Sequence, residues 1–130
     1  MLDRVGVEPP VRTTQCESEK LTEVFGTNAF DLVYARNTLD HSYDPVKAIR
    51  SMIDVVKPGC HALLEHAQNE AEEENYMGMH QWNLSVDDGR FYVWRPGTRI
   101  DVAEALADVG AVTEALRRDP INRVVIRKHA

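Results

Sequence analysis

The chain has 130 residues, enough for one domain with a buried core but few for a complete nucleotide-binding α/β enzyme. Its formal net charge of −6 argues against a nucleic-acid partner, which would need a basic surface. Cys16 and Cys60 lie far apart, and we find neither a signal-peptide pattern nor an apolar run of membrane-spanning length, so we expect a reduced, cytoplasmic protein without a membrane partner.

In the first 26 residues, the sequence predicts only short helices and strands. Met1–Gly6 resembles the last turn of a helix that ends on a glycine, and residues 11–15 (VRTTQ) are compatible with a short strand. A short helix is expected over residues 19–25, followed by Gly26 as its stop. Ser18 is of a residue type that caps the start of a helix through its hydroxyl.

The most informative stretch is residues 30–59, FDLVYARNTLDHSYDPVKAIRSMIDVVKPG. Residues 30–35 form a nearly continuous apolar run, typical of an interior strand that is covered on both faces. A helix is expected to begin at Asp44-Pro45 and to end at Lys57-Pro58-Gly59. Residues 61–65 then form a second strand, and a strand, a helix and a strand in this order predict a parallel pair.

A polar and aromatic segment over residues 65–83 follows the second strand, where open α/β sheets place their ligands. We interpret it as a wall of a substrate pocket, with His66 or His80 as the possible proton acceptor. The alternative is an acidic helix over residues 70–76 that faces solvent, followed by a loop packed on Trp82.

His66, Glu70 and His80 could also act as metal ligands, because His66 and Glu70 are four residues apart and would share a helix face. The third ligand would have to come from His80, Glu65 or His41. None of these spacings is diagnostic of a metal site, so we predict no metal.

The last third of the chain predicts a turn, a helix and a hairpin. Asp87-Asp88-Gly89 is a turn, and the aromatic residues of the extended segment 91–94, Phe91 and Trp94, are expected to fill the core. Asp101 and Glu104 form a capping-box pattern for a helix that Gly110 stops. Residues 111–116 and 123–127 are then expected to form two antiparallel strands.

The pattern FDLVYARNTLDH…DP…KPG resembles the segment after the fourth strand of class I S-adenosylmethionine-dependent methyltransferases of the small-molecule, type 11-like kind. The usual sequence of that segment is FDLV…LEH…DP…LKPGG. His41 and Gly59 match it, Asp40 replaces the commoner glutamate, and Cys60 replaces the second glycine. The resemblance covers residues 16–128.

This resemblance implies an α/β, Rossmann-like fold with a mostly parallel sheet and a terminal antiparallel hairpin, with S-adenosylmethionine as the cofactor. By position, Glu17 would face the adenine amino group, and the backbone N–H of Ser18 would reach the adenine ring. Arg36 and Asn37 would meet the methionine end. The substrate would be a small molecule.

The substrate-binding residues that we predict are Asn69, Tyr76, His80 and Trp82. With His66, they should border the same crevice as Asn37, because both segments leave the carboxyl ends of adjacent parallel strands.

The family's Gly-x-Gly-x-Gly turn and its ribose-binding acid are absent from this sequence. We therefore expect residues 1–130 to form a single, partial methyltransferase domain that resembles the carboxyl-terminal part of the family and binds S-adenosylmethionine weakly. The strand at 30–35 would then expose an apolar edge, which residues 11–15 could cover, or which could lead to self-association. Two other functions stay open: a non-catalytic remnant that serves association, and a metal-dependent, hydrolase-like site.

Overall fold

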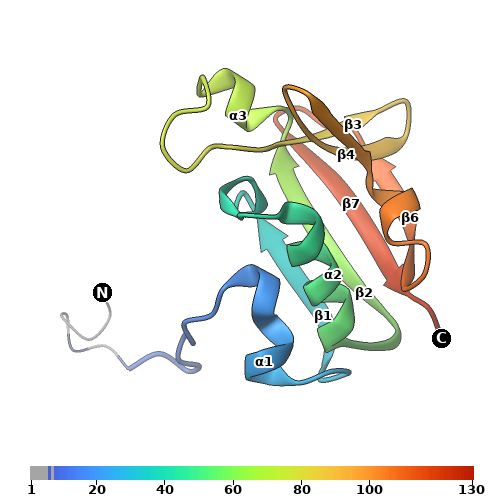
Figure 1. Cartoon of the computed structure of the whole chain (residues 1–130). Helices are drawn as coiled ribbons and strands as arrows, with labels where there is room; N and C mark the ends of the chain where they lie inside the picture. Colours follow the sequence, from blue (N-terminus) through green and yellow to red (C-terminus); the bar gives the residue numbers. More distant parts are fainter. Residues whose placement is uncertain (1–5, 7) are drawn as a thin grey trace.

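The computed structural model describes residue 6 and residues 8–130, which form two β-sheets and several short helices (Figure 1). The larger sheet has the strand order β1-β2-β7-β6, and the smaller one has the order β3-β4-β5. The strands are β1 (Phe30–Arg36), β2 (Val56–Ala67), β3 (Asn83–Asp87), β4 (Arg90–Arg95), β5 (Thr98–Asp101), β6 (Gly110–Leu116) and β7 (Ile121–Lys128). The helical elements are η2 (Ser18–Lys20), α1 (Leu21–Phe25), η3 (Leu39–His41), α2 (Pro45–Val55), α3 (Glu70–Glu73) and α4 (Val102–Ala105).

The pairing in the larger sheet confirms the predicted βαβ unit. Strand β1 runs parallel to β2, while β7 is antiparallel to both β2 and β6. The α/β fold with a terminal antiparallel hairpin is therefore confirmed. The sheet is mixed rather than mostly parallel, because the only parallel pair among the described strands is β1 with β2.

Helix α2 connects the parallel strands and begins as the sequence predicts. The Asp44 side chain accepts a hydrogen bond from Lys47 N at 3.0 Å, and Pro45 takes the first helical position. The helix ends at Val55, earlier than expected. Its last carbonyls accept hydrogen bonds from outside the helix: the carbonyl of Asp54 from Asn28 N and that of Val55 from Ala29 N.

Two predictions about the outer edge of β1 are wrong: the strand at residues 11–15 and the interior position of residues 30–35. Residues 11–15 form no strand, and no described strand pairs with the far side of β1. Strand β1 is therefore an edge strand rather than an interior one. Leu32 and Tyr34, which point to the same face of the sheet, are 55% and 50% exposed. Of the predicted turn at Met1–Gly6, only Gly6 lies among the described residues.

The short helices differ from the predictions in their ends. The helix expected at 19–25 is present as η2 followed by α1, and Gly26 stops it with φ +75°. Ser18 is not its cap, because no side chain caps η2 and the position before it is Glu17. Helix α3 ends at Glu73, because Asn75 and Tyr76 adopt positive φ.

The second sheet was not predicted. Strands β3 and β4 form a hairpin around Asp88-Gly89, which confirms the turn, and Phe91 of β4 is buried in the core as expected. Strand β3 lacks an alternating pattern because its polar residues Asn83 and Ser85 are buried together with its apolar ones. The two sheets share one apolar core, in which helix α2 packs against β1, β2 and β7.

The carboxyl-terminal elements follow the prediction with a shorter helix. Asp101 caps α4 by accepting hydrogen bonds from Ala103 N and Glu104 N. Gly110 begins β6 instead of merely stopping the helix. Trp94 is half-buried, and its indole N–H donates to Asn69 Oδ1 at 3.0 Å.

Candidate functional site

The carboxyl ends of β1 and β2 are joined by Asn37. Its backbone N–H donates to the Glu65 carbonyl at 3.0 Å, and its Oδ1 accepts from Ala67 N at 3.1 Å. Asparagine tolerates the positive φ of 47° at this position, so the chain can turn here. Arg36, just before it, lies 3.7 Å from the Glu65 carboxylate. The Asn37 side chain therefore holds the loop that carries the site.

His66, at the end of β2, holds the start of η3. Its Nε2 accepts hydrogen bonds from the backbone N–H groups of Thr38 and Leu39, at 3.2 and 3.1 Å. The ring hydrogen is therefore on Nδ1, which is buried without a partner among the described residues. Burial lowers the pKa of His66 to about 4, although the charge of Asp40 acts in the opposite direction. His66 is thus neutral and its lone pair is occupied, which argues against the predicted role as a proton acceptor.

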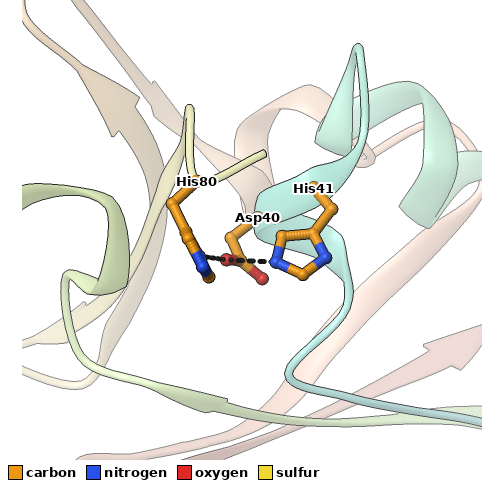
Figure 2. A group of neighbouring side chains, drawn as sticks. All are labelled: Asp40, His41 and His80. Carbon is orange, nitrogen blue, oxygen red and sulfur yellow. Dashed lines mark hydrogen bonds and ion pairs between the residues drawn. The ribbon is translucent and has the colours of Figure 1, made fainter. Parts of the chain in front are cut away.

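Asp40, His41 and His80 form a cluster, which Figure 2 shows. The Asp40 side chain is buried, and its Oδ2 accepts a hydrogen bond from His80 Nδ1 at 2.8 Å. His41 Nε2 lies 3.3 Å from the same oxygen, and the two imidazole rings meet edge to face with centroids 4.7 Å apart. The hydrogen bond to Asp40 raises the pKa of His80, and the charges of Glu74 and Glu70 add to this effect.

A hollow of about 390 Å³ lies next to this cluster, within the size range of small-molecule sites. It is lined by His41, Ser42, Tyr43, Gly78, Met79, Gln81, Trp82 and Arg95. Trp82 closes its inner side and donates its indole N–H to the Tyr43 carbonyl at 3.3 Å. The Arg95 guanidinium lies 4.2 Å from the centre of the Trp82 ring. The hollow therefore offers aromatic surface, a cation and the imidazole of His41, which contacts the ring of His80.

The predicted substrate residues separate into two groups. Trp82 lines the hollow, and His80 joins the cluster beside it, so the 77–82 segment folds back on η3. Asn69 lies elsewhere, since it accepts from Trp94 Nε1 at 3.0 Å. Tyr76 accepts a hydrogen bond from Asn83 Nδ2 at 3.0 Å, which ties its phenol oxygen to the base of β3.

The predicted cofactor residues lie on two segments. The Ser18 hydroxyl is 3.1 Å from Ser42 Oγ, which places η2 beside the loop that borders the hollow. Glu17 is partly exposed and forms an ion pair with Lys20 at 3.0 Å. Arg36 and Asn37 lie at the end of β1, as expected from the sequence.

The metal ligands considered from the sequence are not brought together. The unprotonated nitrogen of His66 accepts hydrogen bonds from backbone N–H groups, whereas His80 contacts Asp40. Among the described residues, the cluster with metal-ligand geometry joins His41 and His80, both considered as a third ligand, to Asp40, and it does not include His66 or Glu70. The departure of Asp40 from the family's glutamate is the only signal in the sequence that pointed to this residue.

No described helix combines the length and apolar character needed to cross a bilayer. No curated protein sequence matches the chain.

Several solved structures share the fold. An S-adenosylmethionine-dependent methyltransferase from Mesorhizobium loti has a TM-score of 0.58 at 15% identity, with 96% of this chain and 73% of that chain covered. One from Clostridium acetobutylicum has a TM-score of 0.52 at 11% identity, with coverage of 99% and 68%. The PH0226 protein from Pyrococcus horikoshii has a TM-score of 0.52 at 12% identity, and this chain covers 57% of its length with 87% of its own. At these identities the likeness concerns the fold.

The family is identified by comparison of the sequence with a family model. The sequence model described as "Methyltransferase domain" matches residues 4–112, which is most of the chain. This match agrees with the resemblance to methyltransferases that the FDLVYARNTLDH segment carries. The chain therefore belongs to the methyltransferase domain family, and it shares its fold with S-adenosylmethionine-dependent methyltransferases.

Proposed function

We propose that this chain takes part in methyl transfer from S-adenosylmethionine to a small molecule that binds in the hollow beside Asp40, His41 and Trp82. The observation that carries the proposal is the position of this hollow. It lies after the carboxyl end of β1, where open α/β sheets bind their ligands, and it is lined by His41, which contacts both Asp40 and His80. Metal-dependent hydrolysis is not favoured, because its expected ligands do not meet.

His80 is the proton acceptor in this proposal. A sulfonium methyl group is already activated, so the protein mainly has to hold the acceptor in line with it. In the transfer, the sulfur–carbon bond breaks and a bond from carbon to an acceptor oxygen or nitrogen forms. The acceptor proton passes to His80 Nε2, because Nδ1 donates to Asp40, and the buried carboxylate stabilises the resulting imidazolium.

The lining of the hollow suggests an acceptor with an apolar or aromatic body and an acidic group. Tyr43 and Met79 are 84% and 65% exposed, and Trp82 adds an indole face. Arg95 supplies a cation that matches a carboxylate. The exocyclic hydroxyl or amine of such a molecule would receive the methyl group.

The cofactor would lie between η2 and the end of β1, with Glu17 and Ser18 at its adenine end and Arg36 and Asn37 at its methionine end. The Ser18–Ser42 contact supports this placement. The absence of the glycine-rich turn and of the ribose-binding acid removes several polar contacts, each worth about 1 kcal/mol. We therefore expect these 130 residues to bind S-adenosylmethionine more weakly than micromolar.

Nuclear magnetic resonance of the ¹⁵N-labelled chain with S-adenosylhomocysteine tests this placement. Amide shifts are expected at residues 17–18 and 36–37 at millimolar ligand. A micromolar dissociation constant, or shifts confined to other segments, would contradict it. Product formation from aromatic hydroxy acids at saturating S-adenosylmethionine then tests the base. His80→Gln should abolish it, whereas His61→Gln, the same change on β2 away from the hollow, should not.

The exposed edge of β1 supports self-association of this chain. Leu32 and Tyr34 are half exposed on a strand without an outer neighbour among the described residues. Leu32→Lys should reduce any concentration-dependent oligomer seen by sedimentation. Val11→Lys adds the same charge at an exposed residue outside the sheets and should leave it unchanged. The free thiols of Cys16 and Cys60 agree with a reducing, cytoplasmic location.

A further inference from the structure

The cluster of Asp40, His41 and His80 offers more than a hydrogen-bonded pair. Each side chain presents one metal-ligand atom, and the three atoms lie within 4.8 Å of one another. The side chains converge from two segments, η3 and the 77–82 loop (Figure 2). We propose that these three residues bind one divalent transition-metal cation such as Zn²⁺.

The distances in the cluster fit this proposal. Zinc ligands lie about 2.0–2.2 Å from the ion, so two neighbouring ligand atoms are about 3.0–3.5 Å apart. Asp40 Oδ2 is 2.8 Å from His80 Nδ1 and 3.3 Å from His41 Nε2. To admit the ion, the Asp40–His80 contact has to open slightly, and the two imidazole nitrogens, which lie within 4.8 Å of each other, have to reach the same spacing. Two imidazoles and one carboxylate are also the ligands of catalytic zinc sites that keep a coordination position open.

The surroundings hold the ligands in place and favour a cation. Asp40 is 3% exposed, and its backbone carbonyl accepts a hydrogen bond from Gln81 N at 3.4 Å. His66 fixes the start of η3 from the opposite side. Glu70 and Glu74 add negative charge near His80, and a bound cation would compensate the buried carboxylate.

The open side of the site faces the proposed acceptor. His41 lines the hollow together with Tyr43 and Trp82, so a free coordination position would meet a hydroxyl or carboxylate bound there. This step of the inference rests on the proposed function, but cation binding itself does not. A cation at His80 Nδ1 replaces the hydrogen bond to Asp40, so ligation and the base role of His80 exclude each other.

Calorimetric titration with Zn²⁺ alone tests the site without donor or acceptor. The chain is used free of any affinity tag, with Cys16→Ser and Cys60→Ser removing both thiols. One ion per chain is expected. Asp40→Asn, His41→Ala and His80→Ala should each weaken binding by about tenfold or more. The matched change His61→Ala should not alter it, and Mg²⁺ should not bind, because imidazole is a poor ligand for this ion.

Circular dichroism shows whether each variant is folded, and His41→Ala is the decisive one because His41 is exposed. Loss of the visible cobalt bands in Co²⁺-loaded His41→Ala, with retention in His61→Ala, would support the proposal independently. Equal weakening by His61→Ala and His80→Ala would overturn it, as would zinc binding that is no weaker when Asp40→Asn, His41→Ala and His80→Ala are combined in one chain. Zinc binding, combined with no methyl transfer by the metal-free chain, would reject the proposed function and leave this inference intact.

Discussion

Two histidines lie near Asp40 in opposite environments. His66 is 5% exposed and accepts two backbone hydrogen bonds at the start of η3. The His80 side chain is 31% exposed and donates to the Asp40 carboxylate. Burial lowers the pKa of the first ring, whereas the carboxylate raises the pKa of the second.

The difference shows how one residue type takes a structural or a chemical role. A buried imidazole that accepts N–H groups has no lone pair left for a substrate, so it stabilises a loop. A partly exposed imidazole that uses one nitrogen to bind a carboxylate leaves the other nitrogen available for a ligand, a proton or a cation. Of the two histidines near Asp40, His66 therefore belongs to the structural scaffold and His80 to the candidate site.

The largest effect is expected from replacing His66. His66→Leu leaves the N–H groups of Thr38 and Leu39 without their acceptor, which should lower the free energy of unfolding by about 2–4 kcal/mol. His66→Gln keeps an acceptor at the position of Nε2 and should cost less than half of this. Urea denaturation measures both, and equal losses in the two variants would show that packing rather than hydrogen bonding holds η3.

Acid should destabilise the protein through the same residue. The folded-state pKa of His66 is about 4, below the ordinary 6.5, so the unfolded chain binds more protons between these values. Stability from this group is complete above pH 6.5 and falls by about 3 kcal/mol as the pH drops to 4. His66→Gln should remove this part of the pH dependence in urea titrations. An unchanged slope in the variant would place the acid sensitivity elsewhere.

His80 should respond to pH in the opposite direction. Its raised pKa makes the contact with Asp40 stabilising below pH 6.5, and this stabilisation is lost as the pH rises through the folded-state value. In metal-free buffer, nuclear magnetic resonance should find the pKa of His80 above 6.5. Asp40→Asn keeps an acceptor for Nδ1 but removes the charge, so it should lower this pKa. An unchanged pKa of His80 in this variant would show that the charge of Asp40 does not raise it.

The sequence predicted the scaffold better than the site. The strand at 30–36, helix α2 and the parallel partner follow one another in the chain, so local patterns were sufficient. The Asp40–His80 contact joins residues 40 positions apart, and no local pattern reports it. His66 and His80 could not be told apart either, because their difference arises from burial. The second sheet was missed because polar Asn83 and Ser85 are buried in it.

The smallest effect is expected on the open side of Asp40. His80 and His41 are partly exposed, and when one of them is removed the buried Asp40 carboxylate keeps the other as its partner, so each single contact is expected to contribute no more than about 1 kcal/mol. His80→Ala and His41→Ala should therefore lower the free energy of unfolding by less than about 1 kcal/mol, well below the loss in His66→Leu. Urea denaturation in metal-free buffer measures all three proteins. A loss in His80→Ala as large as that in His66→Leu would show that His80 also belongs to the scaffold. A small loss together with weaker zinc binding or methyl transfer would identify it as part of the site.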